Sequence, residues 1–253
     1  MEQKRINELT ELLRKLNSGN ISEELRKEAL EIVKNIDPTE LSIAEQNLID
    51  DGMNPQDLRH LCDIHMEVLS EELEKIKSKL ETGHVVNTLI VEHDKILEFL
   101  SSLEELNTKI QDLKSIKGHE DYIEDLKNLA DNILGAEPHH KREEEVLFIE
   151  LEKRGITGPT RIMRMEHDDL RGKKMALKEL ANCINYMDFE DFKERLQELT
   201  SYIVFNLRDH IFKENSILYP TAIDTIKDEK LWEDMRKKCD ELGYCIFTPK
   251  EIL

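Results

Sequence analysis

The sequence predicts an all-α protein, an up-down-up-down four-helix bundle with a small N-terminal helical module. Three observations predict it. Apolar residues recur at helical spacing along almost the whole chain, the alternation typical of strands is nearly absent, and short breaks separate four long helical segments. Short connections between long helices favour antiparallel neighbours. The 253 residues are enough to bury a sizeable core.

The first part of the chain, residues 1–80, is predicted to be the small helical module. Asp37-Pro38 and Asn54-Pro55 are typical helix starts, because Asp and Asn accept a capping hydrogen bond and proline is tolerated in the first turn. Gly83 then interrupts the pattern.

The bundle itself is predicted over residues 84–224. Its breaks lie at Lys117-Gly118, at the Gly- and Pro-containing stretch 154–159, and at Tyr186-Met187-Asp188. The four long helices are expected at roughly 85–114, 119–153, 159–186 and 189–223.

The tail, residues 225–253, is expected to be a short helix and an extended end without an assigned role.

Composition and charge exclude several classes of function. Lys and Arg number 36 against 55 Asp and Glu, a net charge of −19, which argues against nucleic acid or an anionic membrane as partner. No apolar run approaches the roughly 20 residues that span a bilayer. The N-terminus lacks the features of a signal peptide, and the four cysteines are scattered. We therefore expect a soluble, cytoplasmic protein.

One motif, HxxxExx[IV]L[FY], occurs twice, on the second and fourth predicted long helices. It begins at His139 with Glu143 and again at His210 with Glu214. Residues i and i+4 share one face of a helix, so each copy directs an imidazole and a carboxylate to a common point. A mixed nitrogen and oxygen set suits iron or manganese. The motif therefore predicts a metal site.

His140 and Glu144 have the same spacing as His139 and Glu143. Only the frame that begins at His139 keeps the downstream apolar residues aligned with the second copy, so we prefer it. His140 is then predicted to be a neighbour at the surface, and His140→Ala is predicted to leave the metal content intact.

Two single histidines, His93 and His167, lie on the first and third long helices. Each on its own would be interpreted as an ordinary partly buried histidine. However, His93 lies 21 residues before Lys114 and His139 lies 21 residues after Gly118, while His167 and His210 lie 21 and 22 residues from Asp188. At about 1.5 Å rise per residue, all four lie roughly 30 Å from their connecting turns. The same test places His84 and His119 away from this layer.

The chain resembles the hemerythrin-like (HHE) family of cation-binding four-helix bundles over about residues 84–224. The motifs are EHDKIL around His93, HHKREEEVLF around His139, MEHDDLR around His167 and HIFKENSILYP around His210. The stretch GMNPQDLRHLCDIHMEVL and the tail WEDMRKKCDELGYC resemble a hemerythrin-related subfamily with an extra N-terminal helical module.

This resemblance implies a di-iron site bridged by two carboxylates and an oxo or hydroxo group, with Mn or Zn as possible substitutes. Glu143 and Glu214 match the bridges. The terminal ligands match His93, His139, His167 and His210. Hemerythrins usually have a fifth histidine one turn before the His167 position, where this chain has Met163. One iron is then under-coordinated, takes water, or recruits another residue, such as His60 or His65.

Three functions remain open from the sequence. The first is a di-iron protein that binds O₂ or NO as a sensor, store or scavenger. The second is a di-iron enzyme, either oxidase or peroxidase-like or repairing iron–sulfur centres, so whether the protein is an enzyme is left undecided. The third is a metal-free interaction module. The N-terminal module is a candidate surface for a protein partner or for a homodimer.

Overall fold

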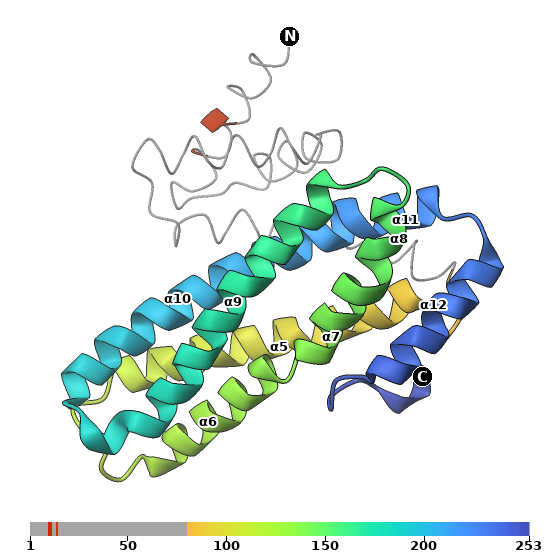
Figure 1. Ribbon diagram of the computed structural model, residues 1–253. Coiled ribbons are helices and arrows are strands. Elements are labelled where there is room, and N and C mark those ends of the chain that lie inside the picture. Colours follow the sequence, from red (N-terminus) through yellow and green to blue (C-terminus); the bar gives the residue numbers. More distant parts are fainter. Residues whose placement is uncertain (1–9, 12–13, 15–79, 253) are drawn as a thin grey trace, which may run out of the picture. The chain divides into compact units, whose positions relative to one another are not determined.

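A computed structural model describes residues 10–11, 14 and 80–252. The predicted module 1–80 therefore lies almost wholly outside the described residues. Across 80–252 the chain is helical, with no strand in that range, and the predicted all-α bundle is confirmed (Figure 1).

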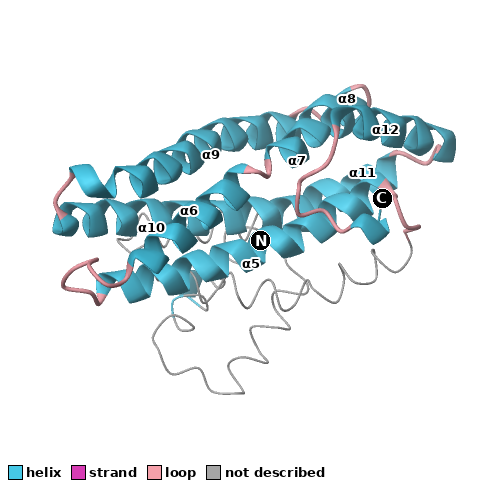
Figure 2. Ribbon diagram, turned by 90° about the horizontal axis from the view of Figure 1, so that it is seen from below, coloured by secondary structure: helices cyan, strands magenta, loops and turns pink. Residues whose placement is uncertain are grey.

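Four long helices form the body of this part: α5 (Val85–Gln111), α6 (Glu120–Leu134), α9 (Gly158–Cys183) and α10 (Phe189–Lys213). They run side by side in both ribbon views (Figures 1 and 2). Helix α6 packs against α5 and α9. Helix α10 is linked to α5 by the hydrogen bond from Asn107 to Gln197, and to α9 by a hydrogen bond from Tyr202 to Asp169.

The core of the bundle is made by apolar residues that all four long helices contribute at helical spacing. Burial of such side chains is the main favourable term in folding. Fully buried examples are Leu100 and Leu103 of α5, Leu126 and Ile133 of α6, Leu177 of α9, and Phe192 and Val204 of α10.

The second predicted helix is not continuous, contrary to the expected range 119–153. Helix α6 ends at Leu134, and after Gly135 and Ala136 the chain continues as α7 (Glu137–Arg142). Pro138 lies in the first turn of α7, where its missing N–H removes no helical hydrogen bond. The proline is therefore accommodated by starting a new helix, and this new helix carries the histidines of the first motif.

Both motif copies contain a stretch of π-helix. The first, η2 (Glu143–Leu147), leads into α8 (Phe148–Glu152), and the second, η4 (Glu214–Leu218), leads into α11 (Tyr219–Thr225). Each π-helical stretch begins at the glutamate of its motif. Single-turn π-bulges inside α-helices occur frequently at functional sites, and here they coincide with the carboxylates predicted to bind metal.

The tail, expected to be a short helix and an extended end, forms one helix and a final turn. Helix α12 (Glu229–Leu242) packs against α5, α7 and η2. It ends at Gly243, whose φ of 87° is a backbone conformation that favours glycine. The chain then turns back and finishes in a short 3-10 helix, η5 (Lys250–Ile252). In the part of the chain that the structure describes, no helix combines the length and apolar character needed to cross a membrane.

Candidate metal centre

Seven buried histidine and glutamate side chains form two groups inside the bundle. The first group contains His140, His167 and His210, and the second contains His93, His139, Glu143 and Glu214. Within each group the ligand atoms all lie within 4.8 Å of one another. All six residues predicted from the sequence belong to these groups, and each is at most 1% exposed.

Glu143 lies where the two groups meet. Its Oε2 atom is 3.4 Å from Nε2 of His139 and 3.5 Å from Nε2 of His167, which belong to different groups. Its other oxygen, Oε1, accepts a hydrogen bond of 2.7 Å from the hydroxyl of Tyr219. A carboxylate in this position faces both groups at once, as a bridging ligand must.

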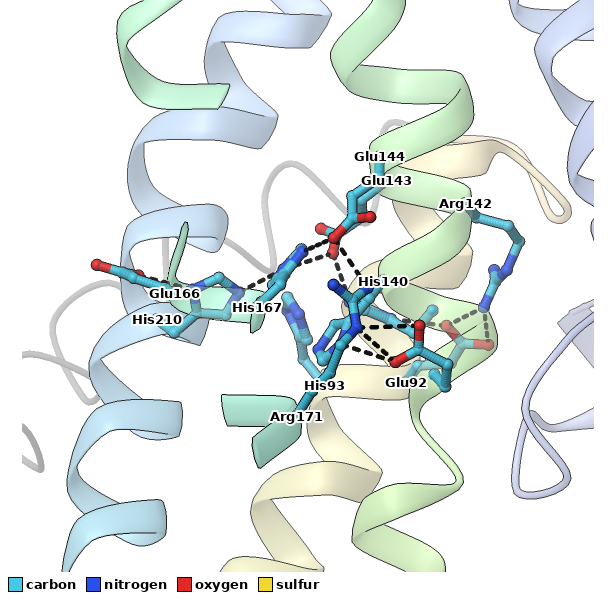
Figure 3. A network of polar contacts seen from close by, with 12 residues as sticks. Glu92, His93, His140, Arg142, Glu143, Glu144, Glu166, His167, Arg171 and His210 are labelled. Carbon is cyan, nitrogen blue, oxygen red and sulfur yellow. Dashed lines mark hydrogen bonds and ion pairs between the residues drawn. The ribbon is translucent and has the colours of Figure 1, made fainter. Parts of the chain in front are cut away.

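Three of the histidines are held from outside by carboxylates (Figure 3). An ionised carboxylate can only accept, so Nδ1 of each ring carries a hydrogen, and in the neutral ring Nε2 is left as the acceptor that can bind a metal. This is the carboxylate–histidine arrangement that orients metal ligands and raises their basicity. The pairs are His139 with Glu92 at 2.8 Å, His167 with Glu144 at 2.7 Å, and His210 with Glu166 at 2.8 Å.

The inward nitrogens of His167 and His210 approach each other closely. Nε2 of one ring is 2.8 Å from Nε2 of the other. With both Nδ1 atoms bonded to carboxylates, the Nε2 atoms of neutral rings would face each other as acceptors, an arrangement that a bound cation would stabilise. The donor set therefore fits a metal cation.

His140 is a correction to the sequence interpretation, which placed it at the surface. It is only 2% exposed, and its ring stacks on His167 with centroids 4.1 Å apart. Adjacent residues of an α-helix point about 100° apart. Both His139 and His140 can face the interior here because α7 is covered on one side by α12 and on the other is tied to α9, through Arg171 and Glu137.

The Nδ1 atom of His140 is buried and has no hydrogen bond among the described residues; the nearest carboxylate, of Glu137, is 3.8 Å away. Burial, followed by the charge of Lys174, lowers the pKa of His140 well below its usual value. The ring is thus neutral at physiological pH, which is the metal-binding form. His140, and not the buried Met163, belongs to the three-histidine group.

The two halves of the bundle repeat one arrangement. The glutamate before each single histidine accepts from the first histidine of the following motif: Glu92 from His139, and Glu166 from His210. The aromatic residue that ends each motif stacks on the single histidine of the other half. Phe148 lies 5.9 Å from His167, and Tyr219 lies 5.5 Å from His93, between ring centroids.

The surroundings of the two halves differ in charge and burial. Glu92 is fully buried and paired with the equally buried Arg142. Burial raises the pKa of Glu92, but the hydrogen bond and charge of His139 and the charge of Arg142 outweigh it, so the pKa falls to about 2. Glu144 and Glu166 are 18% and 28% exposed in their side chains, and Arg171 pairs with Glu144.

Sequence reasoning missed the supporting residues, although a signal for two of them was present. The Glu-His-Asp triplet occurs twice, at Glu92 and at Glu166, and in both cases its glutamate supports the first histidine of the HxxxE motif that follows in the chain. His84 and His119 lie outside both groups, as expected. His60 and His65 lie outside the described residues.

Two family models match the chain. A model of the hemerythrin HHE cation binding domain matches residues 84–222, and a model of a family of unknown function (DUF438) matches residues 9–75. No curated protein matches the chain. The HHE match and the two buried groups together support a metal-binding protein. Since the first match covers more than half of the sequence and contains every residue of both groups, the chain belongs to the hemerythrin HHE cation-binding family.

Proposed function

We propose that the bundle holds two iron ions and uses them to bind O₂ or NO. The observation that carries this proposal is the pair of adjacent buried ligand groups with Glu143 between them. One group offers three imidazoles, and the other offers two imidazoles with carboxylates. Mixed nitrogen and oxygen ligands suit iron, with manganese or zinc as possible substitutes.

The role of each residue follows from its group. His140, His167 and His210 hold one ion, and His93 and His139 hold the other. Glu143 and Glu214 are the bridging carboxylates; Glu143 is supported by its distances to both groups, and Glu214 by its matching place in the second motif. When bound, a pair of ferrous ions supplies an electron from each metal to a diatomic ligand.

The protein's own contribution is orientation and exclusion of water. Glu92, Glu144 and Glu166 fix three imidazole rings so that Nε2 points inward. Phe148 and Tyr219, both fully buried, cover the single histidines with their aromatic faces. A dry, preformed ligand cage of this kind admits a small molecule without requiring a protein acid or base.

The test starts from protein purified from iron-supplied cells. We expect two irons per chain by metal analysis, and near-ultraviolet absorption that changes when the anaerobic ferrous protein meets O₂ or NO. A reversible spectral change supports a sensor, store or scavenger, whereas sustained turnover with peroxide or ferrous iron supports the enzyme alternative. Protein without stoichiometric metal under these conditions overturns the proposal.

The scattered thiols, three of which are free in the described part of the chain, are consistent with a reducing compartment, and we propose the cytoplasm. Fractionation of cells that produce the protein checks this location.

A further inference from the structure

The C-terminal segment after α12 reaches the interior beside one of the two ligand groups. Thr248 is 7% exposed, and its hydroxyl donates a hydrogen bond of 2.5 Å to Oε1 of Glu92. Glu92 is the carboxylate that accepts from Nδ1 of His139 through its other oxygen. One fully buried carboxylate therefore connects the end of the chain to a candidate metal ligand.

Arg142 completes this connection. It is 1% exposed, and its Nη2 atom lies 2.6 Å and 2.5 Å from the two oxygens of Glu92. The same guanidinium contacts the C-terminal segment: Nη2 lies 4.0 Å from the thiol of Cys245, and Cζ lies 4.6 Å from the ring centroid of Tyr244. A buried ion pair of this kind is costly to leave half satisfied. The segment thus covers the pair and supplies one of its hydrogen bonds.

The same segment is anchored to the outside of the bundle by apolar contacts. Phe247 packs edge-on against Phe99 of α5, with ring centroids 5.2 Å apart. The backbone N–H of Thr248 donates to the carbonyl of Cys245 and closes a turn, which fixes the direction of the threonine side chain. Ile246, in the middle of this turn, is 85% exposed and points away.

We propose that residues 244–248, which we name the C-terminal clasp, position the metal ligand His139 by holding Glu92 in place. The proposal rests on the metal-binding function proposed above. Thr248 and Arg142 both bond to Glu92, the support of His139, whereas Glu166, the support of His210, has a side chain that is 28% exposed. The clasp therefore acts on the ion held by His93 and His139 and leaves the three-histidine ion unaffected.

The experiment uses the full chain after its metal has been removed. Anaerobic titration with Fe(II) against a chromophoric chelator measures a separate dissociation constant for each ion. Thr248→Val keeps the shape and removes the hydroxyl. Loss of a group bonded directly to a metal ligand weakens metal affinity about 10- to 100-fold. Thr248 acts through Glu92, which keeps its bond to His139, so one ion should weaken by less than this factor and the other should not weaken. Thr248→Ser should restore binding, and Ile246→Ala is the matched control within the clasp.

A spectroscopic readout separates positioning from general loosening. In the Co(II)-loaded protein, the paramagnetically shifted signal of the His139 Nδ1 hydrogen should exchange with solvent faster in Thr248→Val than in the wild type. If Thr248→Val binds each ion with the same affinity as the wild type, and its Nδ1 hydrogen exchanges at the same rate, the clasp is overturned. Equal weakening of both ions also overturns it, because that result indicates a loss of stability alone.

Two further outcomes are distinguishable. If the wild type binds no Fe(II), the proposed function fails, and the clasp fails with it. If Thr248→Val does not fold, Phe247→Leu carries the test, because it loosens the anchor at Phe99 and leaves the Glu92 network chemically intact. Selective weakening of one ion then supports the clasp, and unchanged binding of both ions overturns it.

Discussion

Nε2 of His167 lies 2.8 Å from Nε2 of His210 in the interior of the bundle. Both rings are held from outside by glutamates, which fixes the direction of their Nε2 atoms. A cation bound at this point would be ligated by both nitrogens, and a metal that binds only the folded state would stabilise it.

Removal of metal should therefore lower the stability of the bundle. A ligand that binds only the folded state stabilises it by about 2.7 kcal/mol when its concentration is 100 times its dissociation constant. We expect a clear fall in the thermal midpoint after treatment with a chelator, measured by circular dichroism, and recovery when Fe(II) is added back without oxygen. Identical midpoints with and without metal would contradict a folded metal site.

His140→Ala should weaken or remove one metal ion, in contrast to the expectation from the sequence. The histidine is buried, neutral and part of the three-histidine group, so its loss leaves only His167 and His210 there. Metal analysis should show fewer than two ions per chain at an iron concentration that gives the wild type two. His119→Ala, at the start of α6 and outside both groups, is the control and should bind metal as the wild type does.

Glu143→Gln and Glu144→Gln make a matched pair, because the two residues are adjacent but have different roles. Glu143 faces both groups, so its loss should remove at least one ion. Glu144 contacts His167 and Arg171 from outside the two groups, so its loss should weaken affinity about 10- to 100-fold and leave two ions bound at excess metal. Chelator competition distinguishes the two results. If Glu144→Gln loses an ion and Glu143→Gln keeps both, Glu144 is the bridging carboxylate instead.

Tyr219→Phe should keep the stacking on His93 and remove the hydrogen bond to Glu143. A buried hydrogen bond to a charged group contributes about 1.5–3 kcal/mol. In the metal-free protein, this variant should lose more free energy of unfolding than a variant that lacks an exposed hydroxyl, because Glu143 stays buried with one contact fewer. Urea denaturation measures this change, and Tyr186→Phe, at a residue that is 87% exposed, is the control.

In the metal-bound protein, the same Tyr219→Phe variant should retain two ions and shift the absorption of the centre, because the carboxylate becomes a stronger donor. An unchanged spectrum would indicate that the Tyr219 hydroxyl does not act on the metal site.

His84, which caps α5, should make stability depend on pH between about 4 and 6.5. Burial lowers its pKa from 6.5 to about 4 in the folded protein, and its Nδ1 atom accepts from the backbone of Val86. As the pH falls, His84 is therefore protonated in the unfolded chain before it is protonated in the folded protein. The contribution of His84 to the free energy of unfolding falls from pH 6.5 downward and reaches its lowest value near pH 4.

The check compares His84→Asn with the wild type, both metal-free. Asparagine keeps a capping acceptor but does not titrate, so the variant should lose less stability over this range. The ligand histidines titrate in both proteins and cancel in the difference. Parallel pH profiles would contradict the role of His84.

The sequence by itself determined the helical class, the depth at which ligands meet, and the six residues with the HxxxE and single-histidine pattern. These features depend on helical periodicity and rise per residue, which are local properties of the chain. His93 and His139 could be placed at one level because each is the same number of residues from a connecting turn.

Only the tertiary structure decided which side each residue faces and what supports it. His140 was assigned wrongly because spacing along one helix does not reveal that α7 is covered on both sides, by α12 and α9. The link from Thr248 to Glu92 joins residues 156 positions apart, and no local pattern records such a contact. Side-chain support from distant segments arises from packing, and packing is settled only when the whole chain has folded.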